Sequence, residues 1–302
     1  FIGLLFCWLI VTTLKQAKRI MLFSYSFCIL ATIPFFYEPS FLWYISLLFS
    51  SFMAGLSVAA WGFYFKSFTS RNDRIKTAAN VLIISNAFMI LINVITEYLS
   101  PSIGLIVSQV ILIVALILQY KTTDVIDFEE KDNVSGYTED VKKPLVILCL
   151  FIALITINSG LMYNVINPAF KHLKWLVSWY WAIPYIVAVF LIKKLPKKFN
   201  RNYILYLAIA MIGFAFIAFM ILDRSATSYF IVNTLMLGAC GIYDLFWWSI
   251  LGEMLDFHRN PAKILGIGLS ANVFGILLGG LIGSIFEGTD MVDGTSILAI
   301  GV

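Results

Sequence analysis

The sequence predicts an all-α membrane protein that crosses the bilayer many times, and three observations support this fold class. Hydrophobic residues make up 61% of the 302 positions and charged residues only 13%, so the chain is much more apolar than a soluble protein. The apolar residues are gathered into runs close to the length of a transmembrane helix, which is about 20 residues. Short polar turns separate the runs, as expected for helices that follow one another through a membrane.

Eleven apolar runs follow one another along the chain. Each is expected to form a transmembrane helix, because a helix satisfies its own backbone hydrogen bonds inside the bilayer. In order, the runs are 1–14, 20–36, 41–65, 78–99, 103–120, 145–165, 173–192, 204–222, 228–251, 264–286 and a last one that starts near Ser296. The first and last runs are short, so we expect a fragment cut at both ends, with the first of twelve helices missing and the last one cut.

Basic residues indicate which ends of the runs face the cytoplasm, because lysine and arginine stay on that side. All but three of the 21 lysines and arginines fall in alternate turns. The turns that hold them are 15–19, 66–76, 121–143, 193–201 and 259–263. Only Lys171, Lys174 and Arg224 fall in the opposite turns. We therefore expect a multi-pass protein of the cell membrane, with the five basic turns in the cytoplasm.

One inner turn, 121–143, differs from the others. It is polar, rich in acidic residues and without apolar periodicity, which is typical of a flexible linker. We expect it to be a cytoplasmic linker between two helix bundles. The N-terminal bundle would comprise residues 1–120 and lack its first helix, and the C-terminal bundle would comprise residues 144–302 with its last helix cut.

Six helices on each side of a long inner linker, with basic turns after the second and eighth helices, resemble the major facilitator superfamily. The turn Lys15-Gln16-Ala17-Lys18-Arg19 keeps the basic residues usual there but has neither the glycine nor the aspartate. The resemblance implies a 6+6 helix bundle that exposes a central site alternately to the two sides of the membrane.

A second resemblance involves the tenth helix and the turn after it. Residues 244–255, followed by Asn260-Pro261-Ala262-Lys263, are similar to the membrane half of certain bacterial regulators. In those regulators a facilitator-like bundle precedes a LuxR-type helix-turn-helix domain. This resemblance implies a sensor in the bacterial inner membrane, and no nucleic-acid partner is expected within the fragment itself.

Asp244 is the ionisable residue that the sequence places well inside the hydrocarbon, in the run 228–251. Keeping a carboxylate there costs roughly 3 kcal/mol unless it faces a cavity or a partner. Asn233 lies about three turns earlier on the same face, and Trp247 or Trp248 continues that face. In the facilitator arrangement this helix lines the central cavity, so the face is a candidate site with Asp244 binding a cation or a proton. The alternative is a structural aspartate held by neighbouring hydroxyl or indole groups.

Two further groups complete the candidate substrate and ion site. Ser57, Trp61 and Tyr64 share one stripe of the fourth helix, and Asn158 and Tyr163 lie toward the outer end of the seventh. Aromatic and amide side chains with one carboxylate would suit a small organic solute that is cationic or amphipathic. The alternative is helix packing or an interfacial belt, where tryptophan and tyrosine are also common.

Small residues recur along one stripe of the eleventh helix. They are Gly268, Asn272, Gly275, Gly279 and Gly283. The last three form a GxxxGxxxG pattern, which lets another helix approach closely. We expect this stripe to serve helix packing.

The sequence contains no pattern typical of an enzyme or a metal site. Paired carboxylates, histidine clusters, a nucleophile with its base and a phosphate-binding glycine loop are all lacking. The four cysteines lie in apolar runs without metal or disulfide spacing. We expect no enzyme activity, no cofactor and no metal, and we expect the lipid bilayer and a small-molecule solute or ligand as partners.

Two functions therefore fit the sequence. The first is a secondary transporter of the major facilitator type, which moves a small organic solute by alternating access. The second is a membrane sensor domain of a LuxR-type regulator, in which ligand binding shifts the bundle between two states. The altered basic turns and the regulator-like tenth helix favour the second function.

Overall fold

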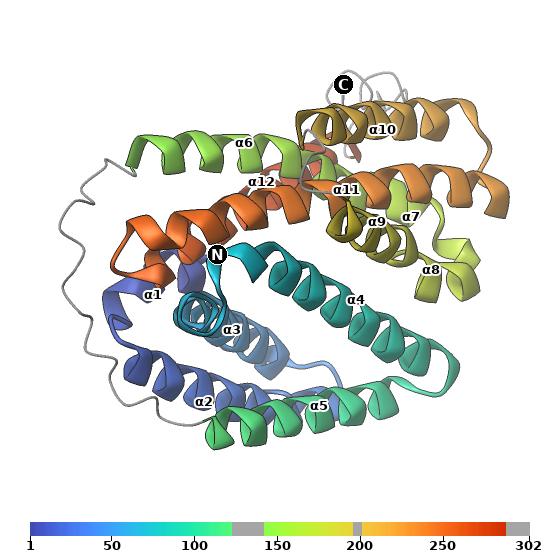
Figure 1. Ribbon diagram of the computed structural model, residues 1–302. Helices are drawn as coiled ribbons and strands as arrows, with labels where there is room; N and C mark the ends of the chain where they lie inside the picture. The colour runs from blue at the N-terminus through green and yellow to red at the C-terminus, as the bar shows by residue number, and fades with distance from the viewer. Residues whose placement is uncertain (123–141, 196–200, 288–302) are drawn as a thin grey trace. The chain divides into compact units, whose positions relative to one another are not determined.

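The computed structural model describes residues 1–122, 142–195 and 201–287, which form helices and turns without strands (Figure 1). In chain order the elements are α1 (Ile2–Ile10), α2 (Leu14–Ala31), η1 (Ile33–Phe36), α3 (Phe41–Phe68), η2 (Arg71–Asp73), α4 (Arg74–Tyr98), α5 (Pro101–Lys121), α6 (Lys142–Leu161), η3 (Met162–Ile166), α7 (Asn167–Ala169), η4 (Lys171–Leu173), α8 (Lys174–Tyr180), α9 (Ile183–Lys194), α10 (Arg201–Ile221), α11 (Ala226–Met254), η5 (Leu255–Phe257) and α12 (Pro261–Glu287).

Within the described residues, nine helical segments are long and apolar enough to cross a membrane. They are Leu14–Phe36, Phe41–Phe68, Arg71–Tyr98, Pro101–Lys121, Lys142–Ala169, Lys171–Lys194, Tyr203–Ile221, Ala226–Phe257 and Pro261–Ile285. Each coincides with one of the complete apolar runs of the sequence. The chain is thus an all-α polytopic membrane protein, as predicted.

The two incomplete runs differ from these nine segments. The first run forms α1, which has nine residues and is shorter than a membrane span. The run near Ser296 lies outside the described residues. Nearly all of the expected cytoplasmic linker 121–143 lies outside them as well.

The described helices belong to two compact units. Unit 1 takes its described residues from Phe1–Arg71, Pro101–Cys149 and Leu251–Ala271. Unit 2 takes them from Asn72–Ser100, Leu150–Ile250 and Asn272–Val302. Each unit therefore combines segments that precede the linker with segments that follow it. The division into bundles 1–120 and 144–302, which follows chain order, stays a prediction.

Helix α3 is the centre of unit 1, because both α1 and α2 pack against it. Helix α2 also packs against α5, and Figure 1 shows these two helices side by side. A capping box fixes the start of α2: the Thr13 hydroxyl accepts from the backbone N–H of Gln16, and the Gln16 side chain accepts from the backbone N–H of Thr13.

The turn between α11 and α12 is fastened to the ends of α1 and α3 within unit 1. Nδ2 of Asn260 donates to the carbonyl oxygens of Trp8 at 3.1 Å and Val11 at 2.9 Å, so it caps the C-terminal end of α1. Nζ of Lys66, near the end of α3, donates to the carbonyl oxygen of His258 at 3.2 Å. These contacts join residues that lie far apart in the sequence and hold the start of α12 in unit 1.

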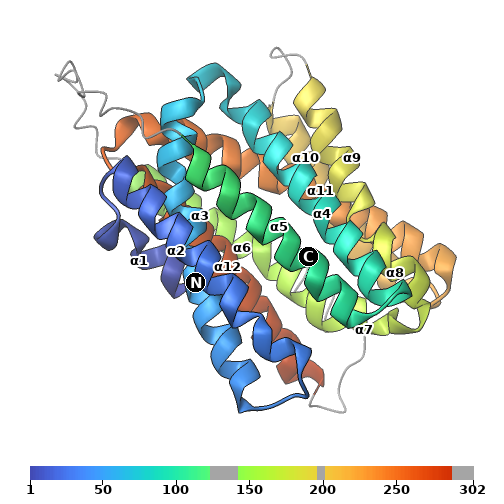
Figure 2. The same ribbon diagram turned by 90° about the horizontal axis from the view of Figure 1, so that it is seen from below.

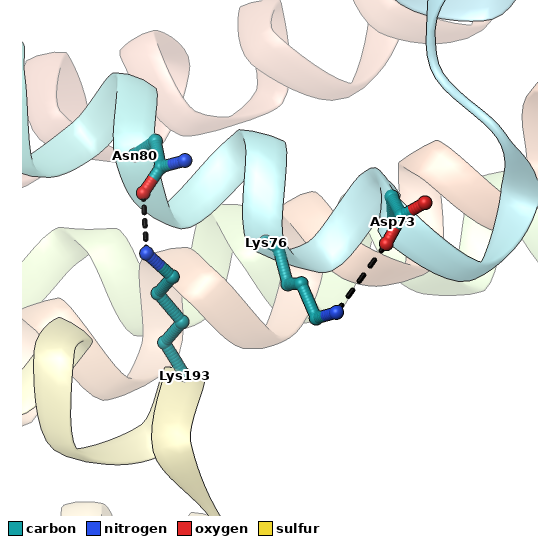
Figure 3. A network of polar contacts seen from close by, with 4 residues as sticks. All are labelled: Asp73, Lys76, Asn80 and Lys193. Atoms are coloured by element: carbon teal, nitrogen blue, oxygen red, sulfur yellow. Dashed lines mark hydrogen bonds and ion pairs between the residues drawn. The ribbon is translucent and has the colours of Figure 1, made fainter.

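Helix α4 packs along α8 and α9 in unit 2, and Figure 2 shows it running beside them. At the N-terminal end of α4, Nζ of Lys193 donates to Oδ1 of Asn80, and Lys76 forms an ion pair with Asp73 at 3.4 Å (Figure 3). The pairing of α4 with α9 explains why the compact units do not follow chain order.

Two of the membrane segments in unit 2 are not continuous α-helices, although their apolar runs predicted regular ones. The first opens into η3, a π-helical turn in which the N–H of Asn167 bonds the carbonyl oxygen of Met162. The second is interrupted at Trp181 and Ala182, between α8 and α9. A proline follows each irregularity, and proline lacks the N–H that would continue the α-helical pattern. Irregular turns of this kind are frequent at functional sites.

The turn between α10 and α11 is held by its own side chains. Asp223 accepts hydrogen bonds from the hydroxyl of Ser225 at 2.6 Å, from the Ser225 N–H at 3.2 Å and from the Ser228 hydroxyl. These hydrogen bonds lower the pKa of the Asp223 carboxyl below its ordinary value. Arg224 donates to the carbonyl oxygen of Phe219 at 2.6 Å, and its guanidinium lies 3.9 Å from the centre of the Phe219 ring.

Candidate functional site

Asp244 is the centre of a polar cluster in unit 2. Its carboxylate receives two hydrogen bonds, from the hydroxyl of Tyr185 at 2.7 Å and from Nε1 of Trp247 at 3.1 Å. Tyr185 belongs to α9, whereas Trp247 lies one turn further along α11. No lysine, arginine or histidine among the described residues forms an ion pair with Asp244. Within the described part of the chain, two neutral donors therefore stabilise the carboxylate and no cationic side chain pairs with it.

Close packing of α9 on α11 makes the hydrogen bond between Tyr185 and Asp244 possible. A Cβ added at Gly241 would lie 2.7 Å from the carbonyl oxygen of Tyr185, which is too close for any side chain. Glycine at this position lets the two backbones approach. The hydroxyl of Tyr185 then reaches the carboxylate of Asp244, which lies one helical turn after Gly241 on α11.

Helix α6 contributes the third side of the cluster. Oγ of Ser159 and Sγ of Cys240 lie 3.8 Å apart, one turn before Asp244 on α11. Tyr163 follows Ser159 by four residues and lies in the π-helical turn η3. Tyr163 keeps 48% of its surface exposed, and Asp244 is half-buried.

Trp247 and Trp248 form an aromatic wall next to the carboxylate. Their rings stack with centroids 5.5 Å apart and an interplanar angle of 24°. Both side chains are buried, Trp247 with 1% of its surface exposed and Trp248 with 8%. The sequence left open which of the two continues the Asp244 face. In the structure Trp247 bonds the carboxylate, and Trp248 stacks on Trp247.

Asn233 lies apart from Asp244, about three helical turns along α11. Its Nδ2 donates to the carbonyl oxygen of Trp181 at 3.5 Å, at the interruption between α8 and α9. Next to it, the hydroxyls of Tyr180 and Thr234 lie 2.6 Å apart. Asn233 is buried, with 4% of its surface exposed, and it satisfies a carbonyl that the broken helix leaves without its regular partner.

Asn158, also in unit 2, has a side-chain oxygen without a hydrogen-bond partner among the described residues. Its Nδ2 donates to the carbonyl oxygen of Ile155 at 3.3 Å. Its Oδ1 is buried and has no hydrogen-bond partner among the described residues. The same holds for Nε1 of Trp181 and the hydroxyl of Tyr229. A buried polar atom without a partner is unusual in a folded protein, and ligand or water contacts are one explanation.

The candidate residues of the fourth helix lie in α3, in unit 1, and are described separately. Ser57 is buried, and Trp61 stacks on Phe65 with ring centroids 4.7 Å apart. The hydroxyl of Tyr64 accepts a hydrogen bond from Nε2 of Gln119 at 2.7 Å. The Trp61 and Tyr64 side chains therefore take part in the packing of unit 1.

The glycine stripe of α12 contacts different elements along its length. In unit 1, a Cβ at Gly268 would overlap the side chain of Leu251. In unit 2, a Cβ at Gly275 or Gly279 would overlap backbone atoms of α6, and one at Gly283 would press on Asn164. The carbonyl oxygen of Asn272 accepts from the Thr156 hydroxyl of α6 at 3.1 Å.

Tyr185 is the site residue that the sequence reasoning missed. It lies in an apolar run directly after Pro184, and no charge marks its position. A usable signal was present, because Pro184 predicts an irregular helix start, and such interruptions in membrane helices often adjoin binding sites. The contact between Tyr185 and Asp244 itself depends on tertiary packing.

The cluster combines one carboxylate with a phenol donor and an indole donor. Among the described residues no group of histidine, cysteine, aspartate and glutamate side chains could hold a metal ion. No model of a known protein family matches the chain, and no curated protein matches it. Functional assignment therefore rests on the side chains around Asp244.

Proposed function

We propose that this protein binds a small organic solute, cationic or amphipathic, at the Asp244 cluster and moves it across the membrane as a secondary transporter of the major facilitator type. The observation that carries the proposal is a carboxylate inside a membrane segment with two neutral donors and no cationic partner among the described residues. Such a group is costly, by roughly 3 kcal/mol, and marks a functional site in membrane proteins by default.

The charge of Asp244 favours a cation as its partner. The hydroxyl of Tyr185 and the indole N–H of Trp247 stabilise the ionised carboxylate, but they leave its negative charge uncompensated. A proton or a positively charged solute would neutralise it. Because the indole of Trp247 bonds the carboxylate and stacks on Trp248, an organic cation at Asp244 would lie next to aromatic side chains.

Alternating access is supported by the irregular helices around the cluster. The π-helical turn η3 and the break at Trp181 and Ala182 interrupt two of the membrane segments of unit 2. Discontinuous membrane helices commonly surround the solute sites of transporters, because their free backbone groups can bind the solute or move with it.

A sensor function is the second candidate, and two observations favour it. The basic turn at 15–19 lacks the glycine and the aspartate usual in facilitators. The regulator-like segment also includes Asn260, whose side chain fastens the turn after α11 to the end of α1. In this function, a ligand at Asp244 would bias α11 and the turn that follows it between two states.

The first experiment is ligand-dependent thermal stability in detergent, with a panel of organic cations, neutral amphiphiles and peptides. We expect a cation to raise the melting temperature of the wild type and to have little effect on Asp244→Asn. Glu97→Gln is the matched control, since it removes one carboxylate from an exposed position at the end of α4. A stabilising ligand that acts equally on Asp244→Asn would contradict the proposed site.

A second experiment separates transport from sensing. The protein is reconstituted in liposomes, and uptake of the stabilising cation is measured with and without an imposed proton gradient. Uptake that is lost in Asp244→Asn supports the transporter. Asp244-dependent binding with no uptake under either condition excludes transport and favours the sensor.

A further inference from the structure

Asn260, in the turn between α11 and α12, bonds two helices of unit 1 with one side chain. Its Nδ2 donates to the carbonyl oxygens of Trp8 and Val11 at the end of α1. Its Oδ1 accepts from the backbone N–H of Lys263 at 3.3 Å, so it also caps the start of α12. The side-chain amide of Asn260 therefore joins the last turn of α1 to the first turn of α12.

His258 fixes the backbone of Asn260. The N–H of Asn260 donates to Nδ1 of His258 at 2.9 Å, and a ring nitrogen can accept only while it carries no proton. The carbonyl oxygen of Asn260 also lies 3.2 Å from Nδ1, but it already accepts from the N–H of Lys263 at 3.2 Å. Protonation of Nδ1 would therefore remove the acceptor of the Asn260 N–H. It would also set a new donor in competition with the first hydrogen bond of α12.

We infer that His258 is a proton-sensing residue of this turn. While the imidazole is neutral, the turn fastens α12 to α1; when the imidazole binds a proton, the Asn260 joint loosens. This inference goes beyond the proposed function, because it requires no solute at Asp244.

The charged groups near His258 come from α3, from α12 and from the turn itself. Nζ of Lys66, in α3, donates to the carbonyl oxygen of His258 at 3.2 Å. The acidic side chain nearest to it in the turn, Asp256, forms an ion pair with Arg71 at 3.8 Å. The remaining charged side chains of these elements beside the turn are Lys263 of α12, Arg259 of the turn and Glu253 at the end of α11.

These surroundings favour the neutral imidazole. Burial lowers the pKa of His258 below its ordinary value of 6.5, and the positive charges of Lys263 and Lys66 act in the same direction. The neutral ring therefore stabilises the fold above pH 6.5, and this contribution is lost as the pH falls through the folded pKa. The joint is thus expected to loosen in mild acid.

The experiment is hydrogen–deuterium exchange of the purified protein in detergent, at about pH 8 and about pH 5.5, on either side of the usual histidine range. Rates are corrected for the intrinsic pH dependence of amide exchange. We expect the amides of 5–11 and 260–265 to open about fivefold more often at the lower pH, which is the effect of one lost hydrogen bond. The amides of α10, in unit 2, should change by less than about twofold, because no bond of theirs involves the joint.

Two variants of His258 bracket the expected response. His258→Asn offers an acceptor in place of Nδ1 but cannot take up a proton, so the joint should stay closed at both pH values. His258→Lys carries a charge and no acceptor, so the joint should be open at both. His172→Asn is the matched control, because it removes the other histidine, whose Nε2 lies 2.9 Å from the carbonyl oxygen of Arg224 in a different turn.

Melting curves at about pH 8 show whether each variant is folded, and His258→Asn alone decides the test if His258→Lys is not. A response that disappears in His258→Asn and persists in His172→Asn supports the inference. A wild type whose α1 opens equally at both pH values would overturn it. A response that persists in His258→Asn, or that is lost in His172→Asn, would assign the proton to another group and overturn it as well.

Discussion

Helices α3 and α11 are of similar length, but they solve the problem of polar side chains in a membrane differently. In the segment Ala226–Phe257, which contains α11, 61% of the most apolar 18-residue stretch is buried inside the protein. The corresponding share in α3 is 11%. Helix α11 carries a carboxylate and bonds it to a neighbouring helix and to its own next turn. Helix α3 carries only aromatic and hydroxyl groups along the stripe that the sequence singled out. The buried carboxylate thus lies in the helix whose surroundings provide hydrogen-bond donors for it.

The largest effect is expected from disrupting the approach of α9 to α11. Gly241→Leu would place side-chain atoms against the backbone of Tyr185, and overpacking of this kind costs about 3 kcal/mol or more. We expect a large fall in melting temperature or loss of folded protein, measured by fluorescence-detected size exclusion. Gly213→Leu in α10 is the matched control, because a Cβ there meets no atom within 4 Å. Equal tolerance of both substitutions would show that the tight packing of α11 is unimportant.

The next effect concerns the donor on α9. Tyr185→Phe leaves one oxygen of Asp244 without its hydrogen bond, which costs about 1–3 kcal/mol for a buried polar group. The cost should shrink in the Asp244→Asn background, and a double-mutant cycle of melting temperatures measures that coupling. Tyr229→Phe provides the control, because the Tyr229 hydroxyl has no partner among the described residues. Additive effects in the cycle would argue against a direct contact.

A smaller effect is expected in α3. Tyr64→Phe removes the hydrogen bond from Gln119, and hydrogen bonds of this kind in membrane proteins average about 0.6 kcal/mol. The melting temperature should fall less than for Tyr185→Phe, since no charge is left behind. A larger fall than for Tyr185→Phe would reverse the comparison between the two helices.

The smallest effect is expected outside the membrane segments, at Asp223. Its pKa is lowered in the folded state, so the ionised carboxylate stabilises the fold above the ordinary value of 3.8, and this contribution is lost as the pH falls through the folded pKa. Ser228→Ala removes one donor to Asp223. Its melting temperature should be slightly lower than that of the wild type at neutral pH, and the difference should shrink below pH 3.8. Ser284→Ala, at an exposed hydroxyl within α12, should show no such pH dependence.

The sequence was a good guide to the membrane segments, for a simple physical reason. A bilayer imposes length and apolarity on each span separately, so every complete run could be recognised without knowledge of its neighbours. Asp244 could be singled out for the same reason, because a charge in an apolar run is conspicuous. Its function, and the function of the other candidate residues, stays a prediction.

The arrangement around Asp244 depends on contacts that a linear pattern does not contain. Tyr185 reaches the carboxylate because glycine at position 241 allows two backbones to approach. The pairing of α4 with α9 joins helices on opposite sides of the linker. Prolines 168 and 184 were visible in the sequence, but whether each produces a π-helical turn or a break depends on the groups available to bond the freed carbonyls.

The π-helical turn η3 holds one more residue per turn than the α-helix on either side of it. Deleting a single residue there would restore regular winding and rotate everything beyond it by about 100° relative to the first part of α6. The part of α6 that lies on Gly275 and Gly279 of α12 would keep its orientation, while the residues after the deletion would turn relative to it. The turn thus decides which side chains of this membrane segment face the same direction on its two sides.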